Sequence, residues 1–229
     1  NGALTLSSGT LTAPSGTFSV SGNWAQTGGT FTPGTNTVTF DGGVGTTQTL
    51  NSGGTAFNNV SHSGAGTLQL LTNALSVSGT FTNSAGTYDA NALATTVTGL
   101  ATVSGGTYTA STATQTFNGG LTISGGTFTG SSGTVDVNGA LTLSSGTLTA
   151  PSGSFTVSGN WAKTGGTFTH NSGTVTLDGT DQTISGSTTF NNLTKQVTTA
   201  RTLTFEAGST QTILGALTLK GASGQLLSL

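Results

Sequence analysis

Apolar residues alternate with hydroxyl residues in short runs along this chain, and small polar segments separate the runs. In residues 138–157 the apolar positions are Leu141 and Leu143, then Leu148, then Phe155 and Val157, each beside a threonine. Such alternation places apolar side chains on one face of a β-strand and hydroxyls on the other. The intervening segments 144–146 and 150–153 have turn compositions rich in Ser, Gly and Pro. The pattern predicts three short strands and three corners within twenty residues.

The same twenty-residue pattern recurs in one register. Blocks that begin at residues 58, 78, 98, 118, 138 and 158 align without a gap, and one column contains only glycine, the next only threonine. The column after these is apolar throughout: Leu68, Tyr88, Tyr108, Phe128, Leu148 and Phe168. An antiparallel sandwich has no reason to keep such a period, whereas a coil needs it because equivalent residues stack on one another. We therefore expect an all-β fold, a right-handed parallel β-helix of about eleven turns, as one domain spanning residues 1–229.

A longer repeat is superimposed on the short one. Residues 1–61 resemble residues 138–194, and 34 of the first 43 positions are identical. Both copies leave the twenty-residue frame, at 41–57 and at 178–190. We expect a loop or bulge to protrude at these irregular turns.

Composition narrows the range of partners. Only 4% of the residues are charged, the net charge is -2, and four residues are basic. So few cations can neutralise few phosphates, which argues against a nucleic-acid partner. No apolar run approaches the roughly 20 residues that span a bilayer, so no membrane insertion is expected. The chain contains no Cys, and no cofactor-binding motif is recognisable.

The acidic and histidine residues give no catalytic pattern. Asp178 and Asp181 are the only acidic pair close in sequence, and they lie in a turn. Glycoside hydrolysis needs two carboxyl groups about 5–9.5 Å apart across a substrate, and a turn containing Asp and Gly is an ordinary feature. Weak calcium binding there is a second reading. His62 and His170 occupy different columns, so they predict no shared metal site. We expect no catalytic, cofactor-binding or metal-binding residue, and therefore no enzyme.

Threonine pairs flank the apolar column, and they form the one array of side chains that suggests a specific ligand-binding surface. If the apolar column points inward, both threonine columns face solvent, about 4.8 Å apart between turns. Insect β-helical antifreeze proteins use comparable grids to hold ordered water against ice, which predicts ice binding here; exposed threonine also suits any β-strand. The grid is interrupted between residues 41 and 106. Its members are Thr10, Thr12, Thr30, Thr32, Thr107, Thr109, Thr127, Thr129, Thr147, Thr149, Thr167 and Thr169. Alternation also predicts that Trp24 and Trp161 point inward.

Several phrases resemble repeats of large secreted bacterial surface proteins. They are residues 21–24 (SGNW), 173–179 (GTVTLDG), 190–194 (FNNLT) and 202–210 (TLTFEAGST). The chain is similar to the parallel β-helix adhesins and exoproteins, such as filamentous haemagglutinin and autotransporter passenger domains. This resemblance implies an extracellular or cell-surface location and a role in adhesion, stalks or matrix. It carries over no catalytic residue.

The expected function is therefore structural: a stiff rod that serves as an adhesin or stalk, or as a filament subunit. The sequence starts without Met, and neither end has the polar residues of a solenoid cap. We accordingly expect either continuation into flanking repeats or end-to-end self-association. The alternative function is binding of a glycan or of ice, and the least favoured function is that of a polysaccharide-degrading enzyme.

Overall fold

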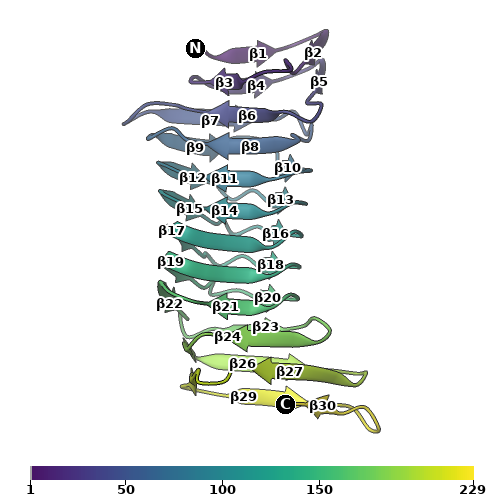
Figure 1. The fold of residues 1–229 in the computed structure, drawn as a ribbon. Coiled ribbons are helices and arrows are strands. Elements are labelled where there is room, and N and C mark those ends of the chain that lie inside the picture. The colour runs from purple at the N-terminus through teal and green to yellow at the C-terminus, as the bar shows by residue number, and fades with distance from the viewer. Residues whose placement is uncertain (1) are drawn as a thin grey trace.

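The computed structural model describes residues 2–229, and it is a stack of about eleven β-coils wound along one axis (Figure 1). No helix occurs in these residues. Neighbouring coils pair through parallel strands, for example β12 (Thr87–Asp89) with β15 (Thr107–Thr109), where Tyr88 stands opposite Tyr108. The twenty-residue period therefore predicted the architecture correctly, since equivalent residues of successive coils form ladders.

Each coil contributes strands to three faces. The first face contains β1 (Leu4–Leu6), β4 (Trp24–Gln26), β7 (Thr47–Asn51), β9 (Thr67–Leu70), β12, β15 and β22 (Thr167–Thr169). The second contains β3 (Phe18–Val20), β6 (Thr37–Phe40), β8 (Asn59–His62), β11 (Phe81–Asn83), β14 (Ala101–Val103), β21 (Trp161–Lys163), β24 (Gln182–Ser185), β27 (Arg201–Phe205) and β30 (Leu227–Ser228). The third contains β10 (Leu75–Val77), β13 (Thr95–Val97), β16 (Gln115–Phe117), β18 (Val135–Val137), β20 (Phe155–Val157), β23 (Thr174–Leu177), β26 (Asn192–Gln196) and β29 (Leu217–Lys220).

Two long strands and two short pairs complete the coil. β17 (Leu121–Thr129) and β19 (Leu141–Thr149) each run across the second and first faces, which joins these faces into one sheet. β2 (Thr10–Thr12) pairs with β5 (Thr30–Thr32) at the N-terminal end of the third face, before the Phe57–Val77 bridge. β25 (Thr188–Phe190) pairs with β28 (Gln211–Ile213) on the C-terminal side of β22. Along the chain the faces follow in the order first, third, second.

The glycine column marks a corner where a side chain would not fit. Gly86 and Gly106 have φ values of 55° and 60°, in the left-handed region that favours glycine. A Cβ on Gly106 would overlap the carbonyl oxygen of Gly86 in the preceding coil. Close stacking of these corners lets the three-residue strands on either side keep their register.

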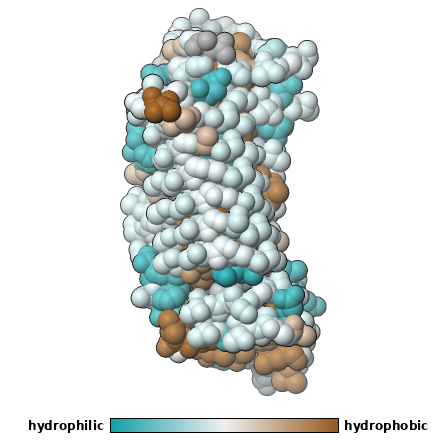
Figure 2. All heavy atoms as spheres, turned by 60° about the vertical axis from the view of Figure 1, so that its left-hand side comes forward, coloured by the Kyte–Doolittle hydropathy of each residue, from teal (hydrophilic) through white to brown (hydrophobic). Residues whose placement is uncertain are grey.

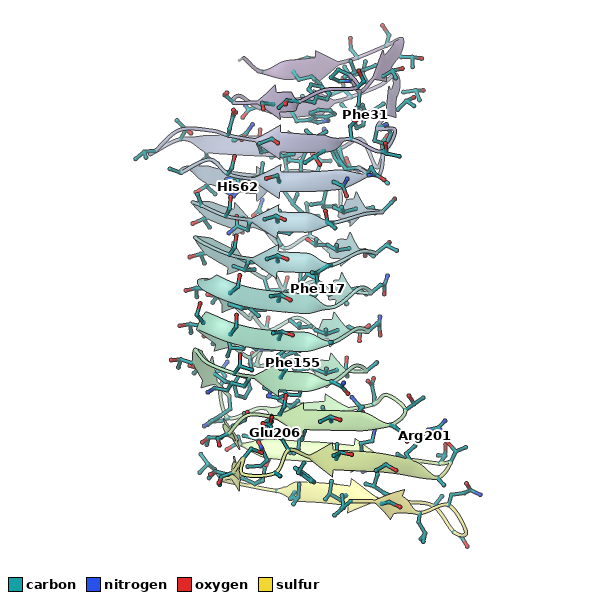
Figure 3. The ribbon with its side chains drawn as sticks, viewed as in Figure 1. Phe31, His62, Phe117, Phe155, Arg201 and Glu206 are labelled. Atoms are coloured by element: carbon teal, nitrogen blue, oxygen red, sulfur yellow. The ribbon has the colours of Figure 1, made fainter. Side chains whose placement is uncertain are left out.

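The core is a continuous column of apolar side chains inside the coil. Trp24 and Trp161 are 0% exposed, so the prediction that both point inward is confirmed. Aromatic rings contact one another from coil to coil: Tyr88 and Tyr108 are tilted with centroids 4.8 Å apart, and Tyr108 and Phe128 are stacked at 4.9 Å. Other rings, including Phe117 and Phe155 in Figure 3, fill the same interior. Each such buried ring stabilises the coil by roughly 1.5–3 kcal/mol relative to an exposed one.

The irregular segments add residues at corners and leave the strand pairing intact. Trp24 pairs with Leu50 in the first copy and Trp161 with Ile184 in the second, although each intervening turn is longer than twenty residues. In the first copy the extra residues form the corner before β7, where Val44 is 82% exposed.

The two copies of the long repeat occupy different faces. Trp24 lies on the first face in β4, and its counterpart Trp161 lies on the second face in β21. The tripeptide at residues 10–12 lies on the third face, and its counterpart at 147–149 lies on the first. The copies are therefore offset by one face, a third of a turn. Asn1, the first residue of the repeat, lies outside the described residues.

Candidate functional site

Eight of the twelve predicted threonines form one grid on the first face. Successive pairs stand in register from β15 through β17 and β19 to β22. The eight are Thr107, Thr109, Thr127, Thr129, Thr147, Thr149, Thr167 and Thr169, all of them half-buried or exposed. Hydroxyls therefore repeat about every 4.8 Å between coils and roughly 6.6–6.8 Å along each strand.

The structure extends one column of this grid beyond the residues found in the sequence. Thr47, Thr67 and Thr87 continue the column of Thr107 toward the N-terminus without a gap. The second column continues as Thr49, Gln69 and Asp89. The expected interruption between residues 41 and 106 therefore holds only for the second column. The sequence missed Thr47 because it lies within the irregular segment 41–57, outside the twenty-residue frame.

The remaining four threonines lie elsewhere. Thr10, Thr12, Thr30 and Thr32 belong to the β2–β5 pair of the third face. They share the Thr-apolar-Thr pattern of the grid, but the offset between the copies places them on another side of the coil. The structure thus brings together eight of the twelve and separates four.

From β12 to β22 the first face presents two outward columns per strand, as β2 and β5 do on the third face, whereas β4 of the first face turns only its central residue outward. In β15 the central Tyr108 is buried between half-buried Thr107 and Thr109, whereas in β14 the outer residues Ala101 and Val103 are buried. The first face therefore carries twice as many outward side chains for the same three-residue strand.

The hydroxyls of the grid have no hydrogen-bond partner within residues 2–229. Beside the grid, the Gln69 amide donates to the Asp89 carboxylate at 2.8 Å, so that polar pair satisfies itself. Figure 2 brings forward the side of the coil where β9, β12, β15 and β22 are labelled in Figure 1, and the middle of this surface has intermediate hydropathy. Strongly hydrophilic and strongly hydrophobic residues gather toward its two ends. The grid is an uncharged surface with unused donors and acceptors.

A second polar feature lies inside the coil at Lys195. Its side chain is 0% exposed, and its Nζ donates to the carbonyl oxygens of Gly179 at 2.8 Å and Thr180 at 2.9 Å. The third partner is Gln182 Oε1. Three acceptors match the three donors of an ammonium group. Burial lowers the pKa of Lys195, and the nearby Asp178 and Asp181 carboxylates oppose this effect.

His62 occupies the corresponding position in the first copy. It is 1% exposed, and its Nδ1 lies 2.6 Å from Asn83 Oδ1. Since the amide oxygen only accepts, the Nδ1 carries the proton. Burial lowers the pKa of His62, and the hydrogen bond to Asn83 partly opposes that shift. The neutral imidazole is therefore the form that fits this interior.

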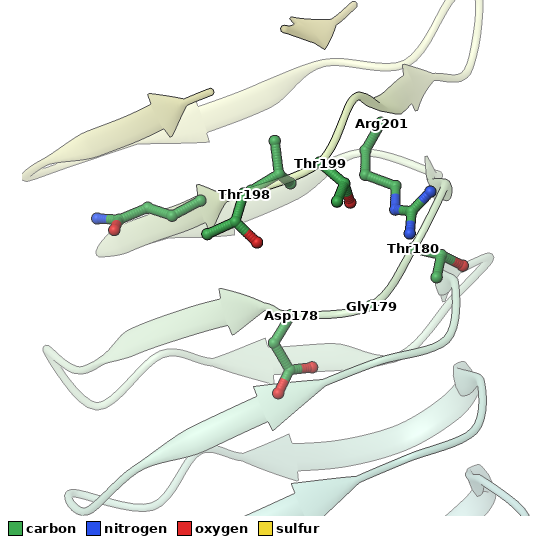
Figure 4. A pocket seen from close by; sticks show the side chains of 8 residues that line it. Asp178, Gly179, Thr180, Thr198, Thr199 and Arg201 are labelled. Atoms are coloured by element: carbon green, nitrogen blue, oxygen red, sulfur yellow. The ribbon is translucent and has the colours of Figure 1, made fainter. Parts of the chain in front are cut away.

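Outside the Lys195 corner lies a shallow pocket of about 230 Å³. Figure 4 shows Asp178, Gly179 and Thr180 on one side and Thr198, Thr199 and Arg201 on the other. Asp178 accepts a hydrogen bond from Ser158 at 2.7 Å, and Asp181 accepts one from the Thr202 amide at 2.8 Å. Both carboxylates thus bind groups of neighbouring coils. Within the described part of the chain, no cluster of three or more His, Cys, Asp or Glu residues could hold a metal ion.

Comparisons with protein-family models, with curated proteins and with solved structures find no match to this chain. Among residues 2–229 there is also no helix of the length and hydropathy that crossing a membrane requires.

Proposed function

We propose that the chain is a non-catalytic, extracellular structural protein whose β-solenoid forms a stiff rod at the cell surface. The observation that carries the proposal is the ladder of parallel strands that links successive coils along three faces. Bending such a rod would strain many hydrogen bonds and a continuous packed core together. About eleven coils at a spacing of about 4.8 Å give a length of roughly 50 Å.

The surface chemistry supports a passive role. The net charge is -2 with 4% charged residues, and hydroxyl groups provide most of the outward columns. A surface with few charges has little long-range field, so its interactions should depend weakly on salt. The same scarcity of cations supports our expectation of no nucleic-acid partner, and the proposed rod needs neither a cofactor nor insertion into a membrane.

The acidic residues support the non-catalytic part of the proposal. Asp178 and Asp181 each accept a hydrogen bond from an adjacent coil, at Ser158 and at the Thr202 amide. A general acid or base would need a carboxyl group directed at a substrate. In the proposed rod these two carboxylates join neighbouring coils, and this supports a structural role for them over the polysaccharide-degrading alternative.

Two arrangements of the rod follow from its architecture. As a module, it would continue a longer coil in an adhesin or stalk, in keeping with the resemblance to bacterial surface repeats. As a filament subunit, it would stack end to end through apolar contacts. Exposed leucines occur in the last coils, with Leu217 51%, Leu226 71% and Leu229 72% exposed. Figure 2 shows a strongly hydrophobic surface at the lower end of the coil.

Negative-stain electron microscopy of the purified chain over a range of concentrations tests this proposal. The rod predicts straight particles of uniform width, unchanged between low and high salt. Particles that lengthen with concentration identify a filament subunit, and short rods that never lengthen identify a module. Round or flexible particles would contradict the structural role.

A second candidate function rests on the threonine grid. Unpartnered hydroxyls at regular spacing on an uncharged face form a surface suited to binding a glycan or ice. This function is compatible with a rod, since the grid occupies only one of three faces.

A further inference from the structure

The threonine grid, on which the second candidate function rests, is regular in two directions. Four coils each present two threonines, and every threonine stands in register with the one in the next coil. The spacings are set by the backbone, about 4.8 Å between strands and roughly 6.6–6.8 Å between alternate residues. A ligand that uses the whole grid must itself be periodic in two directions.

We infer that this ligand is crystalline water, and that the first face is an ice-binding surface. Each threonine offers a hydroxyl that both donates and accepts, as every water oxygen in ice does, with a methyl group beside it. None of the eight hydroxyls has a partner within the described residues, so all are available to ordered water. This inference rests on the ligand-binding candidate above and is independent of whether the rod is a stalk.

The chemistry of the face favours ice over a soluble glycan. Sugar rings commonly stack on an outward aromatic side chain, but Tyr88, Tyr108 and Phe128 of this face are 0% exposed, and Phe168 is half-buried against the core. The grid also contains no charged residue; Asp89, one coil beyond it, is already paired with Gln69. What remains is a neutral lattice of hydroxyl and methyl groups.

The face is also rigid enough to act as a template. Threonine is β-branched and has a restricted χ1 angle. Between the two columns, Tyr108 and Phe128 stack with ring centroids 4.9 Å apart, and both flanking backbones are held in the strand ladder. A surface ordered before binding loses little further entropy when a lattice forms on it.

The internal repeat supplies a matched pair of variants for the test. Thr147 and Thr10 lie in the identical segments 138–153 and 1–16, but Thr147 belongs to the grid and Thr10 lies on the third face. Thr147→Tyr should disrupt the fit to a flat lattice and lower the thermal hysteresis of the chain about tenfold or more. Thr10→Tyr should leave the hysteresis unchanged. Circular dichroism and thermal melting of both variants check that the coil is intact.

Ice adsorption completes the experiment. The full chain, mixed with slowly growing ice, should enter the ice and shape its crystals, and should stay in solution when mixed with microcrystalline cellulose or chitin. Absence of thermal hysteresis and ice adsorption in the unaltered chain would overturn the inference, as would equal losses in the two variants. Binding to cellulose or chitin without binding to ice would also overturn it, while leaving the glycan candidate and the rod intact.

Discussion

The two copies of the long repeat show the same local sequence working in different surroundings. Trp24 and Trp161 enter the core from different faces, and the five residues Gly-Ala-Leu-Thr-Leu occur at 2–6, 139–143 and 215–219 on the first, second and third faces respectively. The sequence of each copy determines the order of its strands and corners, but it does not determine on which face of the coil each strand lies. The face is decided by how many strands precede it, because each strand advances the chain by a third of a turn.

The copies differ most in how they satisfy buried polar groups. Where the second copy has Lys195 with three acceptors, the first has His62 with one partner, Asn83. In the second copy Trp161 Nε1 donates to Thr188 Oγ1 at 3.2 Å. In the first, Gln26 donates to the corresponding Thr55 at 3.0 Å, and Trp24 Nε1 is buried without a partner in residues 2–229.

The largest effect is expected at Lys195. Lys195→Met would leave the carbonyl oxygens of Gly179 and Thr180 without their side-chain donor, whereas Gln182 Oε1 keeps the Gly179 amide as a donor. One unsatisfied buried group costs about 1–3 kcal/mol. We expect the free energy of unfolding to fall by about 3 kcal/mol or more in urea titrations followed by circular dichroism. Lys163→Met is the control, because the Lys163 side chain is half-buried and makes no hydrogen bond in the described structure. Equal losses in the two variants would refute the role given to the Lys195 corner.

The next largest effect is the difference in stability loss between substitutions of the two tryptophans. Trp161→Phe and Trp24→Phe remove similar volume from the core. Only Trp161→Phe breaks a hydrogen bond, the one that the hydroxyl of the 2% exposed Thr188 accepts from the indole. We expect Trp161→Phe to cost about 1–2 kcal/mol more. The same urea titrations measure both, and a larger cost for Trp24→Phe would contradict the comparison.

A smaller effect is expected from pH at His62. Burial lowers its pKa from the usual 6.5, so below that value the unfolded chain binds more protons than the folded chain. Stability is complete above about pH 6.5 and falls as the pH drops toward the folded pKa, by at most about 1.4 kcal/mol per pH unit. The lowered pKa of Lys195 also makes stability fall as the pH drops, but this effect lies in the alkaline range below its usual pKa of 10.5. Urea midpoints measured from neutral to mildly acidic pH should show this slope, and His62→Gln should flatten it.

The control for this prediction is His170→Gln, which should keep the slope. His170 lies at a corner of the second copy and accepts a hydrogen bond from the Ser172 amide at 3.1 Å. A slope that survives His62→Gln would assign the acid sensitivity to other groups.

The smallest effect concerns a contact that the copies share. Ser21 donates to Asp41 and Ser158 donates to Asp178, each at 2.7 Å and each from one coil to the next. Ser21→Ala and Ser158→Ala should both lower the free energy of unfolding by no more than about 1 kcal/mol. Thermal melting of the two variants should give matching shifts, and a loss in only one of them would show that these corners are not equivalent.

Much of the fold could be predicted from the sequence because a coil turns long-range contacts into a local period. Gly106 and Tyr108 stack on Gly86 and Tyr88 because twenty residues make one turn, so each residue lies against its equivalent in the next coil. The inward direction of Trp24 followed from strand alternation alone. These features need no knowledge of distant residues.

The remaining features depend on contacts that no local pattern encodes. The offset between the copies follows from the total number of strands between them, and the irregular turn hides that number. Thr47 joins the grid through pairing with Thr67 across that turn. The three acceptors of Lys195 come from the corner of the preceding coil, and a lysine in an alternating run gives no sign that its amine is buried. Gln48 and Gln182, which occupy equivalent positions inside the two irregular segments, were the available signal for these buried polar corners.

The most direct test of the rigid, in-register coil is a distance along the threonine column. Thr47 and Thr167 are both exposed and lie six coils apart on the first face, and the chain has no native Cys to interfere with labelling. Spin labels on Thr47→Cys and Thr167→Cys, measured by double electron–electron resonance, should give one narrow distribution centred near ~29 Å, six spacings of ~4.8 Å. A broad distribution, or a distance far from this value, would contradict a continuous ladder between these residues and with it the proposed rod.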